Sequence, residues 1–175
     1  MKKRTGIILA IMNVLAWIAF FGLMIKAGAI VWNYVTSFFV PEAPKNFYNG
    51  LNLYDLKQYS YWHFTLVVAF MIVVAVLEAY NAFLITRVLS KIRVKNPFTI
   101  DVSNLIEKIS YFILGTWVVA MLFNVHMNWL SKRVEGNWDK YMVSGDFIFL
   151  AGVIFVFAQI FKKGVEIQTE NELTV

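Results

Sequence analysis

The chain has 175 residues, of which 59% are hydrophobic and 15% are charged. This composition leaves too little polar surface for a soluble protein, so we expect one compact membrane domain over residues 1–175. Cysteine is absent, which excludes disulfides, thiolate metal sites and thiol redox chemistry. The net charge of +5 comes from basic residues that flank apolar runs, so it reflects membrane topology and does not indicate direct binding of nucleic acid.

Four apolar runs bounded by charged residues predict four membrane-spanning helices. Each run is close to the roughly 20 residues that a helix needs to cross a hydrocarbon layer about 30 Å thick. The predicted spans cover residues 6–25, 62–85, 109–130 and 146–161. The sequence therefore predicts an all-α, polytopic membrane protein in which four transmembrane helices form a bundle.

Lysine and arginine are distributed unequally between the two sides of the predicted spans. Positively charged loops stay in the cytoplasm, so we expect both termini on the side with ten basic residues. That side holds Lys2, Lys3, Arg4, Arg87, Lys91, Arg93, Lys95, Lys108, Lys162 and Lys163, and the other side holds Lys26, Lys45, Lys57, Lys132, Arg133 and Lys140. The first run also resembles a secretory signal, but its apolar stretch exceeds the roughly 7–15 residues of a signal core, which favours a retained span.

The segments between the first two spans contain further apolar and aromatic residues. Residues 6–40 as one helix would measure about 52 Å, so we expect the helix to project outward or to bend along the interface before Pro41 ends it. The outer loop 41–61 contains prolines, Asn49-Gly50 and aromatics, which predicts an ordered segment. A lid on the helix ends is favoured over a cap that faces a ligand.

Three other connecting or terminal segments complete the predicted organisation. In the cytoplasmic corner 87–108, Asn96-Pro97 interrupts a helix and Thr99 or Asp101 caps the next one. At or near the edges of the second outer loop, residues 131–144, Trp129, Trp138 and Tyr141 are predicted interfacial anchors. Residues 162–175 are predicted to form a short, exposed cytoplasmic tail.

The sequence also predicts a polar layer inside the membrane. A charged residue at the centre of a span costs about 2.5–3.5 kcal/mol, so Glu78 needs a partner or a proton. Counting from the inner ends of the spans places Asn13 and Thr116 near the depth of Glu78, and Gln159 nearer the cytoplasm. Two interpretations stay open: a structural knot that specifies helix packing, which is favoured, and a proton or cation site in a small transporter or proton-coupled permease.

The two histidines, His63 and His126, are expected at similar depth near the outer ends of their spans. That placement is compatible with a membrane haem protein or a metal site, although interfacial histidines that meet water are the more frequent case. No hydrolase elbow, zinc-protease motif or phosphate loop is present, so we expect neither an enzyme nor a bound cofactor.

Three polar segments carry a resemblance to a known family. They are the outer loop PEAPKNFYNGLNLYDLKQYSYWHF, the corner KNPF followed by NLIEKIS, and the ending AQIFKKGVEIQTENELTV. On these segments the chain resembles the bacterial membrane family catalogued as domain of unknown function 2975, whose members have four spans. The resemblance covers essentially the whole chain and implies a multi-pass protein of the bacterial cytoplasmic membrane, without an established activity.

The resemblance also implies a cytosolic partner. Genes of the family are often found beside one for a small helix-turn-helix transcription regulator, which suggests a membrane protein that senses a signal or tethers that regulator. For the tail, the alternative is that Lys162 and Lys163 anchor the last helix while the remainder is solvated. A homo-oligomer stays open. The candidate docking residues are Arg87, Lys91 and Arg93 in the corner and Glu166, Glu170 and Glu172 in the tail.

Overall fold

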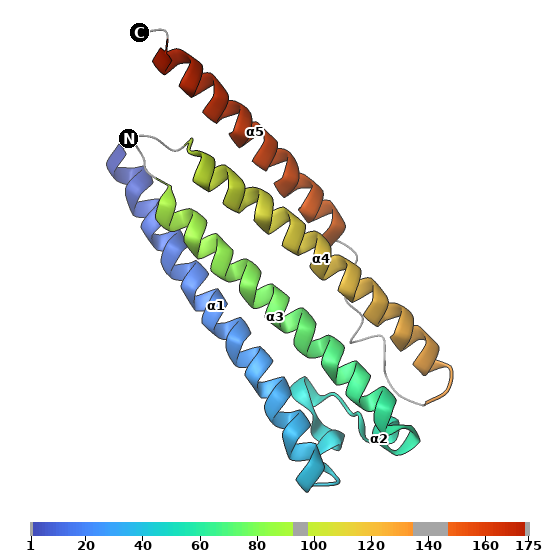
Figure 1. Cartoon of the computed structure of the whole chain (residues 1–175). Coiled ribbons are helices and arrows are strands. Elements are labelled where there is room, and N and C mark those ends of the chain that lie inside the picture. Colours follow the sequence, from blue (N-terminus) through green and yellow to red (C-terminus); the bar gives the residue numbers. More distant parts are fainter. Residues whose placement is uncertain (1, 93–97, 135–146, 174–175) are drawn as a thin grey trace.

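The computed structural model describes residues 2–92, 98–134 and 147–173, and these residues are organised around long helices (Figure 1). Four helices are long and apolar enough to cross a membrane, at Arg4–Phe39, Tyr61–Lys91, Ile100–Ser131 and Ile148–Glu170. The predicted all-α class with four spans is therefore confirmed. The elements are α1 (Lys2–Phe39), η1 (Ala43–Asn46), η2 (Tyr48–Gly50), α2 (Tyr54–Tyr59), α3 (Tyr61–Lys91), α4 (Ile100–Ser131) and α5 (Phe147–Leu173).

The long helices lie in a row and do not close into a bundle. α1 packs on α3, α3 on α4, and α4 on α5 (Figure 1). Among the described residues, no Cα atom of α1 comes within 8 Å of α4 or α5. The most apolar stretches of α3 and α4 are 33% and 28% buried, against 6% and 11% for α1 and α5. An open row is compatible with a membrane because lipid tails cover apolar faces as well as a neighbouring helix does.

α1 is a single helix of 38 residues, which corresponds to a length of about 57 Å. Of the two predicted courses for residues 27–40, the structure has the straight continuation. Tyr34 lies beside the start of α3, where its hydroxyl is 3.1 Å from the Thr65 hydroxyl. The helix ends at Phe39, and Pro41 follows it.

The cap, residues 41–60, packs on the ends of α1 and α3, and its buried side chains share an apolar cluster with Met127 and Leu130 of α4. A tight turn at Asn49 and Gly50 uses positive φ angles of 54° and 75°, which these two residue types tolerate best. Leu53 and Leu56 are fully buried in a cluster with Phe64 of α3. The prediction of an ordered segment is confirmed, and its buried leucine and aromatic side chains hold it in place.

Two predictions about the opposite end have different outcomes. Thr99 is the N-cap of α4, and its hydroxyl accepts a hydrogen bond from the Val102 amide at 3.4 Å. The predicted tail, residues 162–175, continues α5 as a helix to Leu173, a conformation that its polar composition alone did not indicate, and Glu166, Ile167 and Glu170 on it are exposed. Its glutamate, glutamine and lysine side chains favour a helix as well as they favour solvent. Asn96-Pro97, Trp138 and Tyr141 lie outside the described residues.

Candidate functional site

An ion pair joins α1 to α3 within their apolar stretches. Lys26 Nζ lies 2.7 Å from Glu78 Oε2, and the two side chains are 35% and 21% exposed. Lys26 is 13 residues from the end of α1, or about 20 Å along the helix, so its predicted place among the outer charges is wrong. The lysine supplies the partner that an intramembrane carboxylate requires, which favours the structural interpretation of Glu78.

The other members of the predicted polar layer do not join Glu78. Within the described residues, no hydrogen bond or ion pair links any two of Asn13, Glu78, Thr116 and Gln159. The buried Thr116 hydroxyl donates to the Phe112 carbonyl of its own helix at 2.8 Å. Asn13 Oδ1 is buried without a hydrogen-bond partner, and Gln159 is exposed. In place of the layer, the structure has the pair of Lys26 and Glu78. The sequence did not predict this pair, because Lys26 was counted with the charges on the outer side of the membrane.

The two histidines come together between α3 and α4. The ring centroids of His63 and His126 are 5.3 Å apart, which confirms the predicted similar depth. Trp129 packs against both rings, with its centroid 5.0 Å from that of His63 and 6.1 Å from that of His126. His63 Nδ1 and His126 Nε2 are buried and have no hydrogen-bond partner.

This arrangement does not fit a haem ligated by both histidines. Such a haem requires imidazole nitrogens that face each other across the iron, with the porphyrin between the rings. Here the rings lie directly beside each other at 35°, and Phe70 contacts Phe123 at 5.9 Å between α3 and α4. Within the described ranges, no group of three or more His, Cys, Asp or Glu residues is placed to hold a metal ion.

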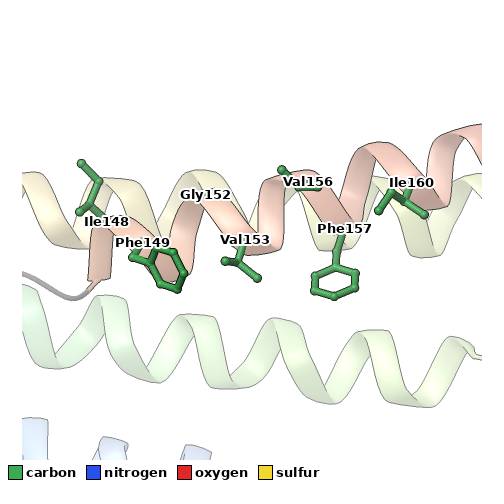
Figure 2. A pocket seen from close by; sticks show the side chains of 7 residues that line it. All are labelled: Ile148, Phe149, Gly152, Val153, Val156, Phe157 and Ile160. Carbon is green, nitrogen blue, oxygen red and sulfur yellow. The ribbon is translucent and has the colours of Figure 1, made fainter.

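An apolar groove runs along α5. It is lined by Ile148, Phe149, Gly152, Val153, Val156, Phe157 and Ile160. Figure 2 shows Phe149, Val153 and Phe157 extending from the same side of the helix. Because every lining side chain is apolar, the groove has no group to orient a polar ligand or to carry out chemistry, and it suits contact with lipid chains.

A cluster of contacts fixes the C-terminal half of α5 against the start of α4. Lys162 Nζ lies 2.7 Å from Glu107 Oε2, and these side chains are 34% and 20% exposed. The Phe98 ring packs on Phe161, with centroids 5.1 Å apart. It also fills the space beside Gly164, where an added Cβ would lie 2.8 Å from Phe98 Cδ1. Phe98 and the first turns of α4 are therefore packed against residues 161–164 of α5.

The structure places four of the six predicted docking side chains. Arg87 stacks over Phe83 with its Cζ 5.0 Å from the ring centroid, and Lys91 forms an ion pair with Asp101 at 2.7 Å. Glu166 and Glu170 are exposed on α5. Arg93 and the Glu172 side chain lie outside the described residues. Phe98 and Gly164 were not predicted as docking residues, although both belong to the segments that carry the family resemblance.

Comparison with known proteins gives one match. A family model described as "Protein of unknown function (DUF2975)" matches residues 7–175. No curated protein and no solved structure matches the chain. The match therefore carries no assigned activity, ligand or partner, and any functional argument depends on the residues described above.

Proposed function

This chain belongs to the DUF2975 family, and we propose that it is a small regulatory or sensory membrane protein that holds a soluble partner at one end of its helices. The four spans make it an integral membrane protein with little chain outside the membrane. A protein of this kind acts by binding, and its binding surface has to come from the helix ends and the short connections. In this proposal the partner end is cytoplasmic, and the membrane is the bacterial cytoplasmic membrane.

The projection of α5 is the observation that carries the proposal. Phe98, just before α4, packs at Gly164, and α5 continues nine residues farther to Leu173. Those residues add about 14 Å of helix beyond the start of α4. Figure 1 shows α5 extending past the neighbouring helix at this end. A helix that leaves the row in this way presents side chains to a partner without disturbing the spans.

The charge of the projecting segment indicates the chemistry of the partner. Residues 164–173 contain three glutamates and no lysine or arginine. Ile167 lies between two of these glutamates and is 50% exposed. Glu166 is paired with Lys163 at 2.8 Å on the exposed surface, and an acidic helix with an exposed isoleucine fits a partner whose surface is basic and partly apolar. DNA-binding regulators are typically basic, and we therefore propose a small helix-turn-helix regulator as the partner, bound so that it stays at the membrane.

The basic side chains at the same end support a cytoplasmic orientation. Once Lys26 is removed from the outer group, ten basic residues remain on the proposed inner side and five on the outer side. The inner excess is therefore larger than the sequence alone indicated. A surface next to cytoplasmic headgroups retains positive charge, while the acidic end of α5 extends beyond it.

The direct test is affinity capture from native membranes with two forms of the chain. One form is complete, and the other lacks residues 164–175. We expect the complete chain to capture a small DNA-binding protein and the truncated form to capture none. The matched control is Gln159→Ala, an exposed change on the spanning part of α5, which should leave capture unchanged. Equal capture by the complete and the truncated chain would contradict the proposal.

A further inference from the structure

A second groove lies between α3 and α4, just inside the membrane from the cap. We propose that it binds a neutral, membrane-soluble ring compound that carries carbonyl oxygens and a hydrocarbon tail, that is, a molecule of the quinone class. The groove has a volume of about 470 Å³, within the roughly 300–1,000 Å³ of small-molecule sites. This inference does not depend on the proposed cytosolic partner, since it concerns the opposite end of the helices.

One end of the groove is built from flat rings. His63, His126 and Trp129 all line it, with ring centroids 5.0 to 6.1 Å apart. The His126 and Trp129 rings are nearly parallel, at 12°. The His63 ring is tilted by 35° to His126 and by 46° to Trp129, so the stacked pair of His126 and Trp129 offers the flat surface on which another planar ring can pack.

The same end contains polar atoms that lack a partner. His63 Nδ1 and His126 Nε2 are buried with no hydrogen-bond partner, a state that buried polar groups rarely keep. A neutral imidazole has one N–H donor, and rotation of the ring about χ2 exchanges the positions of its nitrogen and carbon atoms. Such a rotation would turn an N–H of either histidine toward the groove, where the carbonyl oxygen of a bound ring would accept it.

The other end of the groove is apolar. It is formed by Leu66, Phe70, Leu122 and Val125, which follow the ring cluster toward the centre of the membrane. His63 lies in the first turn of α3, close to the outer ends of the helices. A polar ring near the interface and an apolar channel toward the hydrocarbon match the two parts of a quinone with its tail.

The charge of the lining favours a neutral ligand over an anionic lipid. None of the described residues that line the groove is Lys, Arg, Asp or Glu. The guanidinium of Arg133 lies 3.7 Å from the centroid of Trp129, and its Nη1 donates to the Trp129 carbonyl at 3.2 Å. This cation belongs to the rim and does not enter the groove. A lipid phosphate would find no charged partner inside the groove, whereas a carbonyl oxygen would accept a hydrogen bond from one of the unpartnered imidazoles.

The test is a titration of the complete protein, in nanodiscs of zwitterionic phospholipid, with ubiquinone-1. Binding is measured by isothermal calorimetry, with a prenylated benzene that lacks carbonyl oxygens as the matched ligand. We expect saturable binding of ubiquinone-1 and about tenfold weaker binding of the benzene, a difference typical of one lost hydrogen bond. Absence of saturable binding to the unmodified protein, or equal affinity for both compounds, would overturn the proposal.

Variants separate this groove from other apolar surfaces. His63→Leu and His126→Leu should each weaken ubiquinone-1 binding by about tenfold, while Phe157→Leu in the groove of α5 should not change it. If a histidine variant fails to fold, the imidazole ¹⁵N resonances of the unmodified protein provide the second measurement, and they should shift on saturation. Unshifted resonances, or displacement of the quinone by anionic phospholipid with no effect of the histidine variants, would contradict the assignment.

Discussion

The ammonium of Lys26 lies 2.7 Å from the carboxylate of Glu78, and this ion pair joins α1 to α3 within their membrane-spanning stretches. α1 packs on no other long helix among the described residues. The pair is therefore a specific polar contact on a helix whose side chains are mostly apolar. It fixes the register of α1 against α3, because sliding either helix by one turn would leave two charges unpartnered in hydrocarbon.

Removal of the lysine alone should destabilise the protein. In Lys26→Leu, Glu78 keeps its cost of burial and loses its partner, and we expect a loss of about 2.5–3.5 kcal/mol. The double variant Lys26→Leu, Glu78→Leu should recover most of this loss, since an apolar pair needs no compensation. Reversible unfolding in detergent measures both. Lys45→Ala is the control, because its ion pair with Glu42 is exposed and contributes at most about 1 kcal/mol. If the free energy of unfolding of Lys26→Leu equals that of the unmodified protein, the ion pair does not stabilise the packing of α1 on α3.

Membrane orientation can be tested directly because the chain has no cysteine. Single substitutions Lys45→Cys in the cap and Lys163→Cys on α5 each provide one thiol at opposite ends of the row. The ten-to-five bias of basic residues predicts that a membrane-impermeant maleimide labels position 45 in intact cells and position 163 only after permeabilisation. The opposite labelling pattern would place the end of α5 outside the cell and would exclude a cytosolic partner there.

Two glycines of α5 should respond oppositely to alanine. At Gly152 an added Cβ meets nothing within 4 Å, so Gly152→Ala should stabilise the helix by about 0.5–1 kcal/mol. At Gly164 the Cβ would lie 2.8 Å from Phe98 Cδ1, and the ring has to move away. Thermal unfolding should show the gain at 152 and not at 164. In a Phe98→Ala background the ring is gone, so adding Gly164→Ala should raise the stability above that of Phe98→Ala alone. A gain in stability from Gly164→Ala in the otherwise unmodified protein would show that Phe98 does not fix the helix.

The helices and the cap follow from local features of the sequence. Apolar runs identify the spans, Thr99 marks the start of α4, and Asn49-Gly50 marks the turn of the cap. Each of these features depends on residues that are close in the chain. Local chemistry of this kind, namely apolar length, capping hydroxyls and residues that tolerate positive φ, acts in the same way before and after the chain folds.

The arrangement of the helices could not be predicted in the same way. Lys26 and Glu78 are separated by 52 residues, and their pairing depends on α1 continuing straight past the lysine. Whether four spans form a bundle or a row is set by small differences in packing, since lipid covers an apolar face equally well. The extension of α5 was missed because a polar, charged sequence is typical of both a solvated tail and an exposed helix.

Partner capture should depend on the ion pair at the base of the projecting helix. Lys162→Glu opposes Glu107 with a like charge, loosens α5 where it leaves the row and should reduce capture of the regulator severalfold. The charge swap Lys162→Glu, Glu107→Lys restores an attractive pair at the same 2.7 Å position and should restore capture. Because the swap keeps the net charge of the unmodified protein, recovery would show that the orientation of α5 matters and not the local charge alone. Loss of capture in both variants would instead indicate that Lys162 contacts the partner directly, and full capture by Lys162→Glu would show that the partner does not require a fixed helix.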